Sequence, residues 1–176
     1  MLHSTSRLLL RAPVAHDLQR LFAIYGDPAT QRYNPAGPLG DISQAQALLD
    51  HWLHHWQQHG YGPWAIARRA RPDEVLGFGG ISWHDYLGIK RLNLGYRLAV
   101  EAWGQGYATE LAQAALELGF KELALPHLFA LVRPEHQASI RVLEKAGLRR
   151  IDLLDDVPGQ APSLVYRIDR PAQARP

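Results

Sequence analysis

The sequence predicts one α+β domain, and three observations carry that prediction. Its 176 residues, 47% of them hydrophobic, are enough for a single domain with its own core. In the middle of the chain, three β segments follow one another with short connections, which favours an antiparallel meander. In the second half, strands and helices alternate, so the order is neither all-α nor all-β. We expect the domain to span residues 1–170 and the polar, proline-bearing tail at 171–176 to be frayed.

The first part of the chain predicts one strand and two helices. Residues 7–11 form a short apolar strand segment, and residues 16–25 carry apolar side chains at helical spacing. A second helix is expected over residues 43–59, where apolar residues from Ala45 to Trp56 form one stripe. Ser43 and Gln46 match a capping box at its start, and Gly60 supplies its end.

The rest of the chain supplies the meander and the alternating elements. Strands are expected at 64–68, 75–83 and 91–99, with residues 71–74 as the turn of the first hairpin. The helix after them is expected to turn Glu110, Gln113, Glu117 and Lys121 outward. The elements predicted after the meander are a helix at 107–123, a strand at 128–132, a helix at 136–146, and strands at 151–154 and 164–168.

The composition excludes several classes of protein. The chain has no cysteine, which excludes a disulfide framework, a thiolate metal site and a cysteine nucleophile. The net charge is +2 and no basic run occurs, so the charge does not favour a nucleic-acid partner. No apolar stretch approaches the ~18 residues needed to span a bilayer, and the first residues lack a signal-peptide layout. We therefore expect a cytoplasmic protein with no membrane or nucleic-acid partner.

A histidine stripe runs along the second helix. His51, His55 and His59 recur at every fourth residue. Three positions on one straight helix lie too far apart to share one metal ion, so we predict no metal site. Trp52 and Trp56 suggest that the stripe faces away from the core.

The most informative segment is the loop at residues 99–107, where a strand leads into a helix. Gly104 and Gly106 let backbone N–H groups turn toward one point, and the first helical turn leaves further N–H groups free at its positive end. This combination can cradle a phosphate, although a plain turn with two glycines is the simpler alternative. No Gly-Lys-Ser/Thr follows, and Thr109 stands where a dinucleotide fingerprint requires its third glycine.

Residues 102–110, Ala-Trp-Gly-Gln-Gly-Tyr-Ala-Thr-Glu, resemble the acetyl-CoA loop of the GNAT N-acetyltransferases, in particular the RimJ/RimL-like branch. The segments at 7–11, 61–66, 76–81, 94–98 and 138–148 resemble other parts of that family in the same order, so the resemblance covers nearly the whole chain. It implies a mixed, mostly antiparallel central sheet of about seven strands flanked by helices. It also implies a splay, often opened by a bulge, between the fourth and fifth strands, which are residues 91–99 and 128–132.

The resemblance further implies acetyl-CoA as a co-substrate and no metal. The pyrophosphate would bind backbone N–H groups from Gly104 to Thr109, the pantetheine arm would follow the strand before the loop, and an N–H near Leu98 would polarise the acetyl carbonyl. The residues that this assigns to acetyl-CoA binding are Tyr96, Arg97, Leu98, Trp103, Gly104, Gln105, Gly106, Tyr107, Ala108, Thr109, His136 and Ser139.

The chain departs from the family pattern at two positions. His136 stands where the family usually has asparagine, and Leu143 stands where some members have a general-acid tyrosine. Ser139 shares a helix face with both, so it is our candidate for assisting the leaving thiolate, with a packing role as the alternative. Glu101 and His84 are further catalytic candidates, each of which could instead be a solvated surface residue.

The acceptor implied by the resemblance is an amine, either a small molecule or a protein N-terminus. Tyr33, Asn34, Trp83 and His84 are the candidate acceptor contacts, because loops in these regions carry specificity. Whether the chain forms a homodimer is left open. Two alternatives also stay open. One is an acyl-CoA-binding sensor or scaffold without turnover, and the other is a nucleotide-binding module that uses the same loop.

Overall fold

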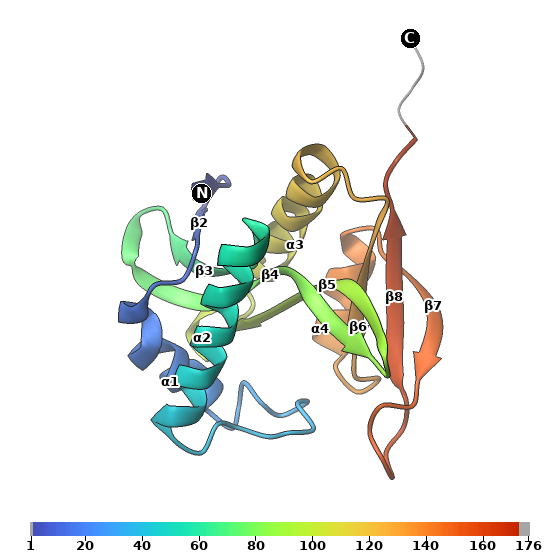
Figure 1. The fold of residues 1–176 in the computed structure, drawn as a ribbon, viewed down its shortest axis with the longest axis horizontal. Coiled ribbons are helices and arrows are strands. Elements are labelled where there is room, and N and C mark those ends of the chain that lie inside the picture. The colour runs from blue at the N-terminus through green and yellow to red at the C-terminus, as the bar shows by residue number, and fades with distance from the viewer. Residues whose placement is uncertain (1, 173–176) are drawn as a thin grey trace.

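The structure, a computed structural model, describes residues 2–172, so residues 173–176 of the expected tail lie outside it. One eight-stranded sheet runs through the molecule in the order β1-β2-β3-β4-β5-β6-β8-β7 (Figure 1). Neighbouring strands pair antiparallel except for β5 and β6, which are parallel. The strands are β1 (Leu2–Ser4), β2 (Leu8–Arg11), β3 (Pro63–Arg68), β4 (Arg71–Tyr86), β5 (Ile89–Leu98), β6 (His127–Val132), β7 (Arg149–Leu154) and β8 (Ser163–Asp169).

The predicted mixed, mostly antiparallel sheet is confirmed, with one strand more than expected. β1 has three residues and pairs with β2 at the edge of the sheet. So short a segment shows too little alternation of apolar and polar residues to be recognised in the sequence.

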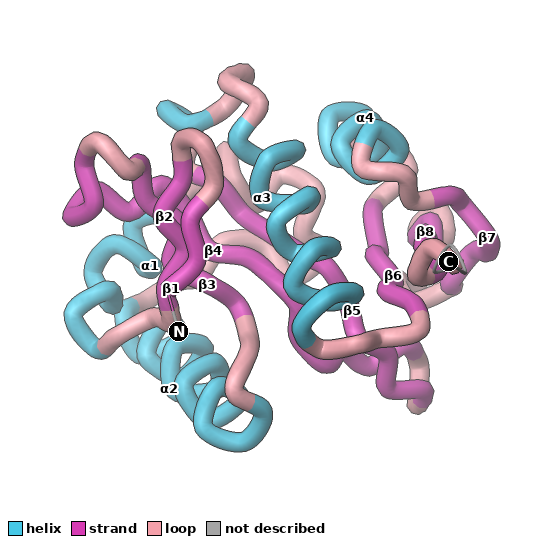
Figure 2. The backbone as a smooth tube through the Cα atoms, turned by 90° about the horizontal axis from the view of Figure 1, so that it is seen from above, coloured by secondary structure: helices cyan, strands magenta, loops and turns pink. Residues whose placement is uncertain are grey.

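Four helices cover the two faces of the sheet. They are α1 (Leu18–Tyr25), α2 (Ile42–His59), α3 (Tyr107–Glu117) and α4 (Gln137–Lys145). Figure 2 shows α1 and α2 on one side of the sheet and α3 on the other, and each side has its own apolar core. α4 contacts α3 and β6. None of the helices in the described part of the chain is long and apolar enough to cross a membrane.

Two element boundaries differ from the prediction for local reasons. Arg68 pairs with Arg71, so the first hairpin turns at Arg69 and Ala70 and not at residues 71–74. Register shifts next to Ala67 accommodate this tighter turn. At α2, the N-cap is Asp41, whose carboxylate accepts the N–H groups of Ser43 and Gln44. This carboxylate replaces the expected capping box, because it reaches the free N–H groups of the first turn.

The helix predicted at 107–123 changes its winding before it ends. After α3, residues Leu118–Glu122 form a π-helical turn, in which the Leu123 N–H donates to the Leu118 carbonyl at 3.0 Å. Gly119 lies inside this turn, and a Cβ there would come within 2.8 Å of Leu128 Cδ1 on β6. The glycine therefore allows the turn to pack closely on the sheet.

The splay predicted between the strands at 91–99 and 128–132 corresponds to β5 and β6. These strands share one registered pair, Asn93 with Phe129, within residues 2–172. β4 and β5, in contrast, pair without interruption from Gly77–Leu98 to Tyr86–Ile89. The bulge expected to open the splay is therefore not found in the register of β5 against β4. In the described chain, no further pair joins β5 to β6 between Asn93 and Leu98, and this unpaired stretch of β5 positions the site.

Candidate functional site

The glycine loop ends in a set of free backbone donors at the start of α3. Gly104 and Gly106 adopt positive φ angles of 70° and 78°, a conformation that strongly favours glycine. Gly106 is the N-cap, and its carbonyl accepts the first helical bond, from the Glu110 N–H at 3.1 Å. The N–H groups of the intervening first turn have no acceptor one turn earlier in the helix. Together with the positive end of the helix, they form a site suited to an anion.

Glu110 anchors this helix start to the N-terminal segment. Its carboxylate accepts bonds from the Thr5 hydroxyl (2.5 Å), the Ser6 hydroxyl (3.0 Å), the Arg7 N–H (2.9 Å) and Arg7 Nε (2.7 Å). Burial alone would raise its pKa, but these bonds together lower the pKa of Glu110 to about 2. The side chain is only 13% exposed, so the expectation that Glu110 faces outward is wrong.

Arg7 extends the same anchor to the glycine loop. Its Nη1 donates to the Gln105 carbonyl at 2.8 Å, and its guanidinium carbon lies 4.7 Å from the centre of the Tyr107 ring. Sequence reasoning missed Arg7 as a site residue. It lies 103 residues from Glu110, and no local pattern links the two positions.

Side chains of the loop also hold the loop itself. Trp103 Nε1 donates to the Leu98 carbonyl at 2.9 Å, while about half of the Trp103 side chain stays exposed. Gln105 Nε2 donates to the Glu101 carbonyl at 2.8 Å. The loop therefore has a fixed shape in which the glycines, and not the longer side chains, border the free N–H groups.

The opening between β5 and β6 presents backbone groups of alternate β5 residues. The Ala99 N–H donates to the Leu76 carbonyl, so the hydrogen-bonded pairs with β4 fall on odd-numbered residues of β5. The N–H and C=O groups of Tyr96 and Leu98 therefore point away from β4, toward β6. Since the strands have separated there, the backbone groups of Tyr96 and the Leu98 N–H can bind an extended ligand segment, whereas the Leu98 carbonyl already accepts the bond from Trp103 Nε1.

Tyr96 and Ser139 bridge the same opening. The Tyr96 hydroxyl and Ser139 Oγ are 3.0 Å apart, and they join β5 to the first turn of α4. Burial raises the pKa of Tyr96, against the lowering effects of the Ser139 bond and the Arg97 charge. The phenol is therefore protonated at neutral pH and can donate. Leu143, on the same helix, is buried.

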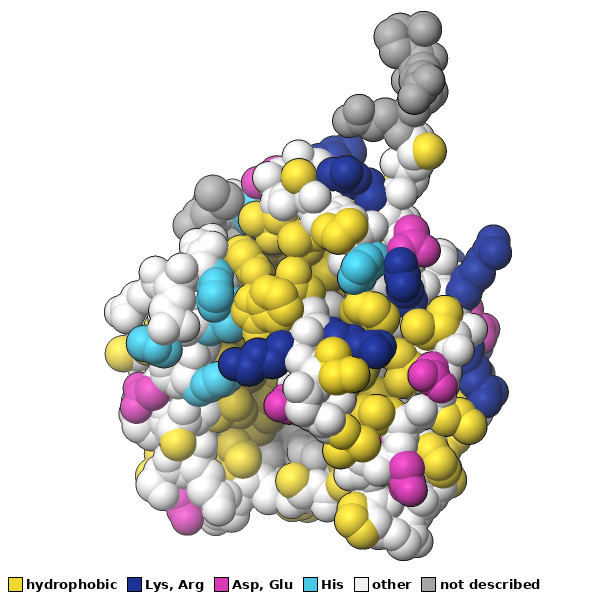
Figure 3. Space-filling view, turned by 45° about the vertical axis from the view of Figure 1, so that its right-hand side comes forward, with side chains coloured by type: hydrophobic (Ala, Val, Ile, Leu, Met, Phe, Trp, Pro, Cys, Tyr) yellow, Lys and Arg dark blue, Asp and Glu magenta, His cyan; other side chains and the backbone are white. Residues whose placement is uncertain are grey.

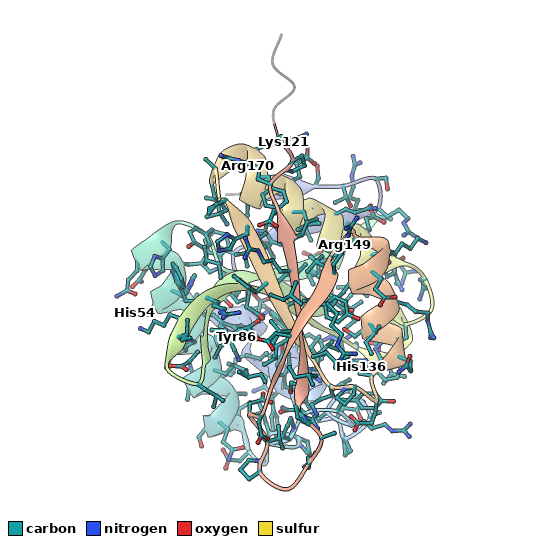
Figure 4. The ribbon with its side chains drawn as sticks, turned by 90° about the vertical axis from the view of Figure 1, so that its right-hand side faces the viewer. His54, Tyr86, Lys121, His136, Arg149 and Arg170 are labelled. Atoms are coloured by element: carbon teal, nitrogen blue, oxygen red, sulfur yellow. The ribbon has the colours of Figure 1, made fainter. Side chains whose placement is uncertain are left out.

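On the acceptor side, the α1–α2 loop meets the start of α4. The rings of Tyr33 and His136 stack, with centroids 4.3 Å apart and planes 19° apart. Burial lowers the pKa of His136, and the Arg97 charge lowers it further, so the imidazole is neutral at pH 7. Figure 4 shows His136 at the start of α4. A cavity of about 400 Å³ adjoins this stack and is lined by Arg32, Tyr33, Asn34, Pro35, Arg133, Glu135 and Gln160.

Arg97 lies on the face of β5 opposite to Tyr96. Its Nη1 donates to the Thr30 carbonyl, and its guanidinium carbon lies 5.6 Å from the centre of the Tyr25 ring. Its Nε is buried without a hydrogen-bond partner among the described residues. The side chain thus points toward α1 and the loop after it, and the backbone groups of Arg97 pair with β4, so neither faces the β5–β6 opening.

Three predicted residues lie apart from this group. Glu101 pairs with Arg20 at 2.5 Å, which lowers the pKa of Glu101, and it borders a different cavity of about 480 Å³. Trp83 and His84 are exposed and pair with Leu92 and Arg91 near the β4–β5 hairpin end. Arg91 precedes Tyr96 by five residues, or about 17 Å along the strand. The structure therefore groups Tyr33, Tyr96, Arg97, His136 and Ser139 but leaves Glu101, Trp83 and His84 outside.

The histidine stripe of α2 is not uniformly solvated. Figure 3 shows exposed histidine side chains over α2, but His55 is only 7% exposed. Its Nδ1 donates to the Tyr61 carbonyl at 2.9 Å, and its Nε2 accepts the Trp83 N–H at 3.3 Å. The expectation that the whole stripe faces away from the core is wrong for His55. In residues 2–172, no group of three or more His, Asp or Glu side chains could hold a metal ion.

Comparison with known proteins gives the context for this geometry. A family model described as acetyltransferase (GNAT) domain matches residues 7–149. Protein YkkB of Bacillus subtilis is 36% identical over 145 residues, 82% of this chain and 83% of that protein. An N-acetyltransferase named p20 from Bacillus licheniformis is 30% identical over 86% of this chain and 84% of its own. An acetyltransferase structure from Agrobacterium tumefaciens has a TM-score of 0.81 at 28% identity, covering 97% of this chain and 95% of that one.

Proposed function

The chain belongs to the GNAT acetyltransferase family, and from this premise we propose that it transfers an acetyl group from acetyl-CoA to a primary amine. The observation that carries the proposal is that the free N–H groups at the start of α3 and the open edge of β5 stand at the two ends of one short loop. This arrangement fits a ligand with a pyrophosphate at one end and an extended amide-bearing arm at the other. The acceptor we propose is a small amine or a protein N-terminus, in keeping with the RimJ/RimL-like features of the loop.

The residues around the glycine loop fit the pyrophosphate. Both glycines hold the left-handed conformation that exposes the backbone, and the first-turn N–H groups of α3 are directed outward. The Arg7–Glu110 anchor holds this arrangement in place without a ligand. Binding therefore requires little reordering of the loop, which favours affinity.

The β5–β6 opening orients the reacting thioester, which supplies the activated acetyl group. The backbone of Tyr96 and Leu98 holds the arm, and the Leu98 N–H stabilises negative charge on the acetyl oxygen. The amine nitrogen forms a bond to the acetyl carbon in a ternary complex, and the carbon–sulfur bond breaks. The Ser139 hydroxyl, held by Tyr96 at 3.0 Å, donates a hydrogen bond to the leaving thiolate, which takes up its proton from water.

The attacking amine loses a proton, and a basic side chain near the amine has to take it up. The Arg20 pair lowers the pKa of Glu101, which makes this carboxylate a weak base. His136 is neutral at pH 7 because burial and Arg97 lower its pKa, and it stacks on Tyr33, which lines the acceptor cavity. We therefore propose that His136 takes up this proton, in preference to Glu101 and His84, the candidates from the sequence.

A ligand panel tests this function directly. We expect acetyl-CoA and CoA, but not ATP or NAD, to raise the melting temperature by binding the native state. CoA release that depends on an added amine then establishes transfer. Stabilisation by CoA without acetylation of any amine in a broad panel would instead support a sensor, which the buried Leu143 at the tyrosine position favours. Selective stabilisation by ATP or NAD would overturn the proposal.

A further inference from the structure

The charge of Arg97 is not balanced by any carboxylate in residues 2–172. Two other arginines with buried or partly buried side chains have acidic neighbours. Arg11 makes two bonds of 2.7 Å to the Asp17 carboxylate, and Arg133 has Glu135 and Asp156 at 3.9 and 4.0 Å. Arg97 has the Thr30 carbonyl, the Tyr25 ring and a buried Nε without a partner in the described chain. A buried donor without a partner is unfavourable, so its presence calls for an explanation.

The place of Arg97 in the fold explains why its Nε has no partner in the described chain. Its backbone adjoins Leu98, whose N–H faces the β5–β6 opening, while its side chain points to the α1–α2 side of the sheet. The Tyr33–His136 stack lies on that side and joins the acceptor loop to α4. Since Nη1 is already used by Thr30, the edge of the guanidinium that carries Nε is the one left for a ligand. An oxyanion with two oxygens matches that edge in a bidentate pair.

We propose that the acceptor is a small amine that carries a carboxylate, and that the Arg97 guanidinium binds this carboxylate. The inference rests on the proposed acetyl transfer and narrows its acceptor. Arg97 and Leu98 are neighbours at the end of β5, so the carboxylate site and the N–H that faces the acetyl group belong to the same end of the strand. A small amino acid carries an amine and a carboxylate together, whereas a polyamine would bring further positive charge toward Arg97 and be disfavoured.

The test compares acceptors that differ only in the carboxylate. Pairs of amino acids and their carboxamides are assayed by acetyl-CoA-dependent CoA release, together with putrescine, spermidine and a C-terminally amidated tripeptide. We expect kcat/KM for the carboxylates to exceed that of the carboxamides by roughly tenfold or more, as for a hydrogen bond to a charged group. A preference for carboxamides, polyamines or the blocked peptide would overturn the proposal.

Substitution of Arg97 separates recognition from a structural role. We expect Arg97→Gln to lower kcat/KM for carboxylates roughly 10- to 100-fold more than kcat/KM for the matched carboxamides, because any effect of the lost charge on the pKa of His136 is common to both acceptors. Arg97→Lys should restore part of the loss, because a charge remains without the bidentate edge. Arg91→Gln is the matched control, since Arg91 lies on the same strand and face. An equal loss with every acceptor would overturn the proposal in favour of a structural role.

A binding measurement keeps the inference testable even if turnover fails. Calorimetry on the CoA-saturated protein compares an N-acetylated amino acid with its carboxamide. We expect tighter binding of the carboxylate in the unchanged protein and equal binding after Arg97→Gln. Equal binding in the unchanged protein would overturn the inference about Arg97. Absence of both CoA binding and turnover would instead overturn the proposed function on which it rests.

Discussion

Two arginines, Arg7 beside the glycine loop and Arg97 on β5, balance their charge in different ways. On the α3 side, Arg7 meets the Glu110 carboxylate at 2.7 Å and the Gln105 carbonyl at 2.8 Å. On the α1–α2 side, Arg97 meets the Thr30 carbonyl and the Tyr25 ring, with no ion pair to any described residue. The charge of Arg7 beside the glycine loop is therefore balanced by the protein's own Glu110, and the charge of Arg97 is not balanced by any described carboxylate.

This difference indicates how each of the two regions would bind its substrate. A loop whose anchor is satisfied internally keeps its shape between turnovers and presents the same N–H groups to every incoming ligand. A guanidinium without a counter-charge in the protein can pair with a negative charge only on a ligand, so it contributes to ligand specificity. Three sets of substitutions test this comparison. They change a glycine of the loop, the carboxylate that anchors the loop, and the hydroxyl pair that lies between the two regions.

The largest effect is expected from Gly106→Val. A β-branched residue at φ 78° is strained, and its side chain would stand at the mouth of the anion site, so we expect CoA affinity to fall about 100-fold or more. Gly60→Val is the matched control, because Gly60 has φ 72°, open space around it and a place at the far end of α2. Calorimetry on both folded variants measures the effect. Equal affinities in the two variants would place the anion site elsewhere.

A smaller effect is expected from Glu110→Gln, which removes the anchor charge. The pKa of Glu110 is lowered from 4.5 to about 2, so ionised Glu110 stabilises the fold above pH 4.5, and this stability is lost as the pH falls toward 2. A shift of this size corresponds to at most about 3 kcal/mol, and we expect a loss of about 2 kcal/mol at pH 7.

The same variant should flatten the fall in stability between pH 4.5 and 2. Urea unfolding as a function of pH measures both changes. Glu117→Gln is the control, because Glu117 lies on the same helix but is exposed and pairs only with Lys121. Equal unfolding free energies for the two variants at pH 7 would show that the anchor does not stabilise the fold.

The glycine loop and the sheet could be predicted because their signals are local. Gly104, Gly106 and the helix that follows stand together in the sequence, and the meander is visible as three neighbouring apolar segments. The Arg7–Glu110 anchor and the Tyr33–His136 stack could not be predicted. Each joins segments about a hundred residues apart, and each depends on side-chain directions that only packing fixes.

Local competition explains the other differences. The Asp41 carboxylate accepts the N–H groups of Ser43 and Gln44 because it stands one residue before the helix, so the helix begins earlier than the expected capping box at Ser43. His55 turns inward because the Tyr61 carbonyl and the Trp83 N–H offer a partner to each ring nitrogen. A polar residue can therefore be buried within a polar stripe when the neighbouring strands satisfy it.

The smallest effect is expected at the Tyr96–Ser139 pair, which lies between the two regions. If the Ser139 hydroxyl assists the leaving thiolate, Ser139→Ala removes an interaction that matters most in the transition state, so kcat falls while acetyl-CoA affinity stays the same. We expect a loss of about tenfold, at or below the low end for a positioned proton donor, because water can replace a half-buried hydroxyl.

Tyr96→Phe sharpens this test. It leaves the Ser139 hydroxyl in place but removes its 3.0 Å partner, so its effect on kcat should be smaller than that of Ser139→Ala, and the double variant should be no slower than Ser139→Ala. If Ser139 only packs within the first turn of α4, alanine should lower stability by about 1 kcal/mol or less and leave kcat unchanged. Steady-state rates and unfolding curves on the same samples separate the two roles, since a proton donor changes the first and a packing residue changes the second.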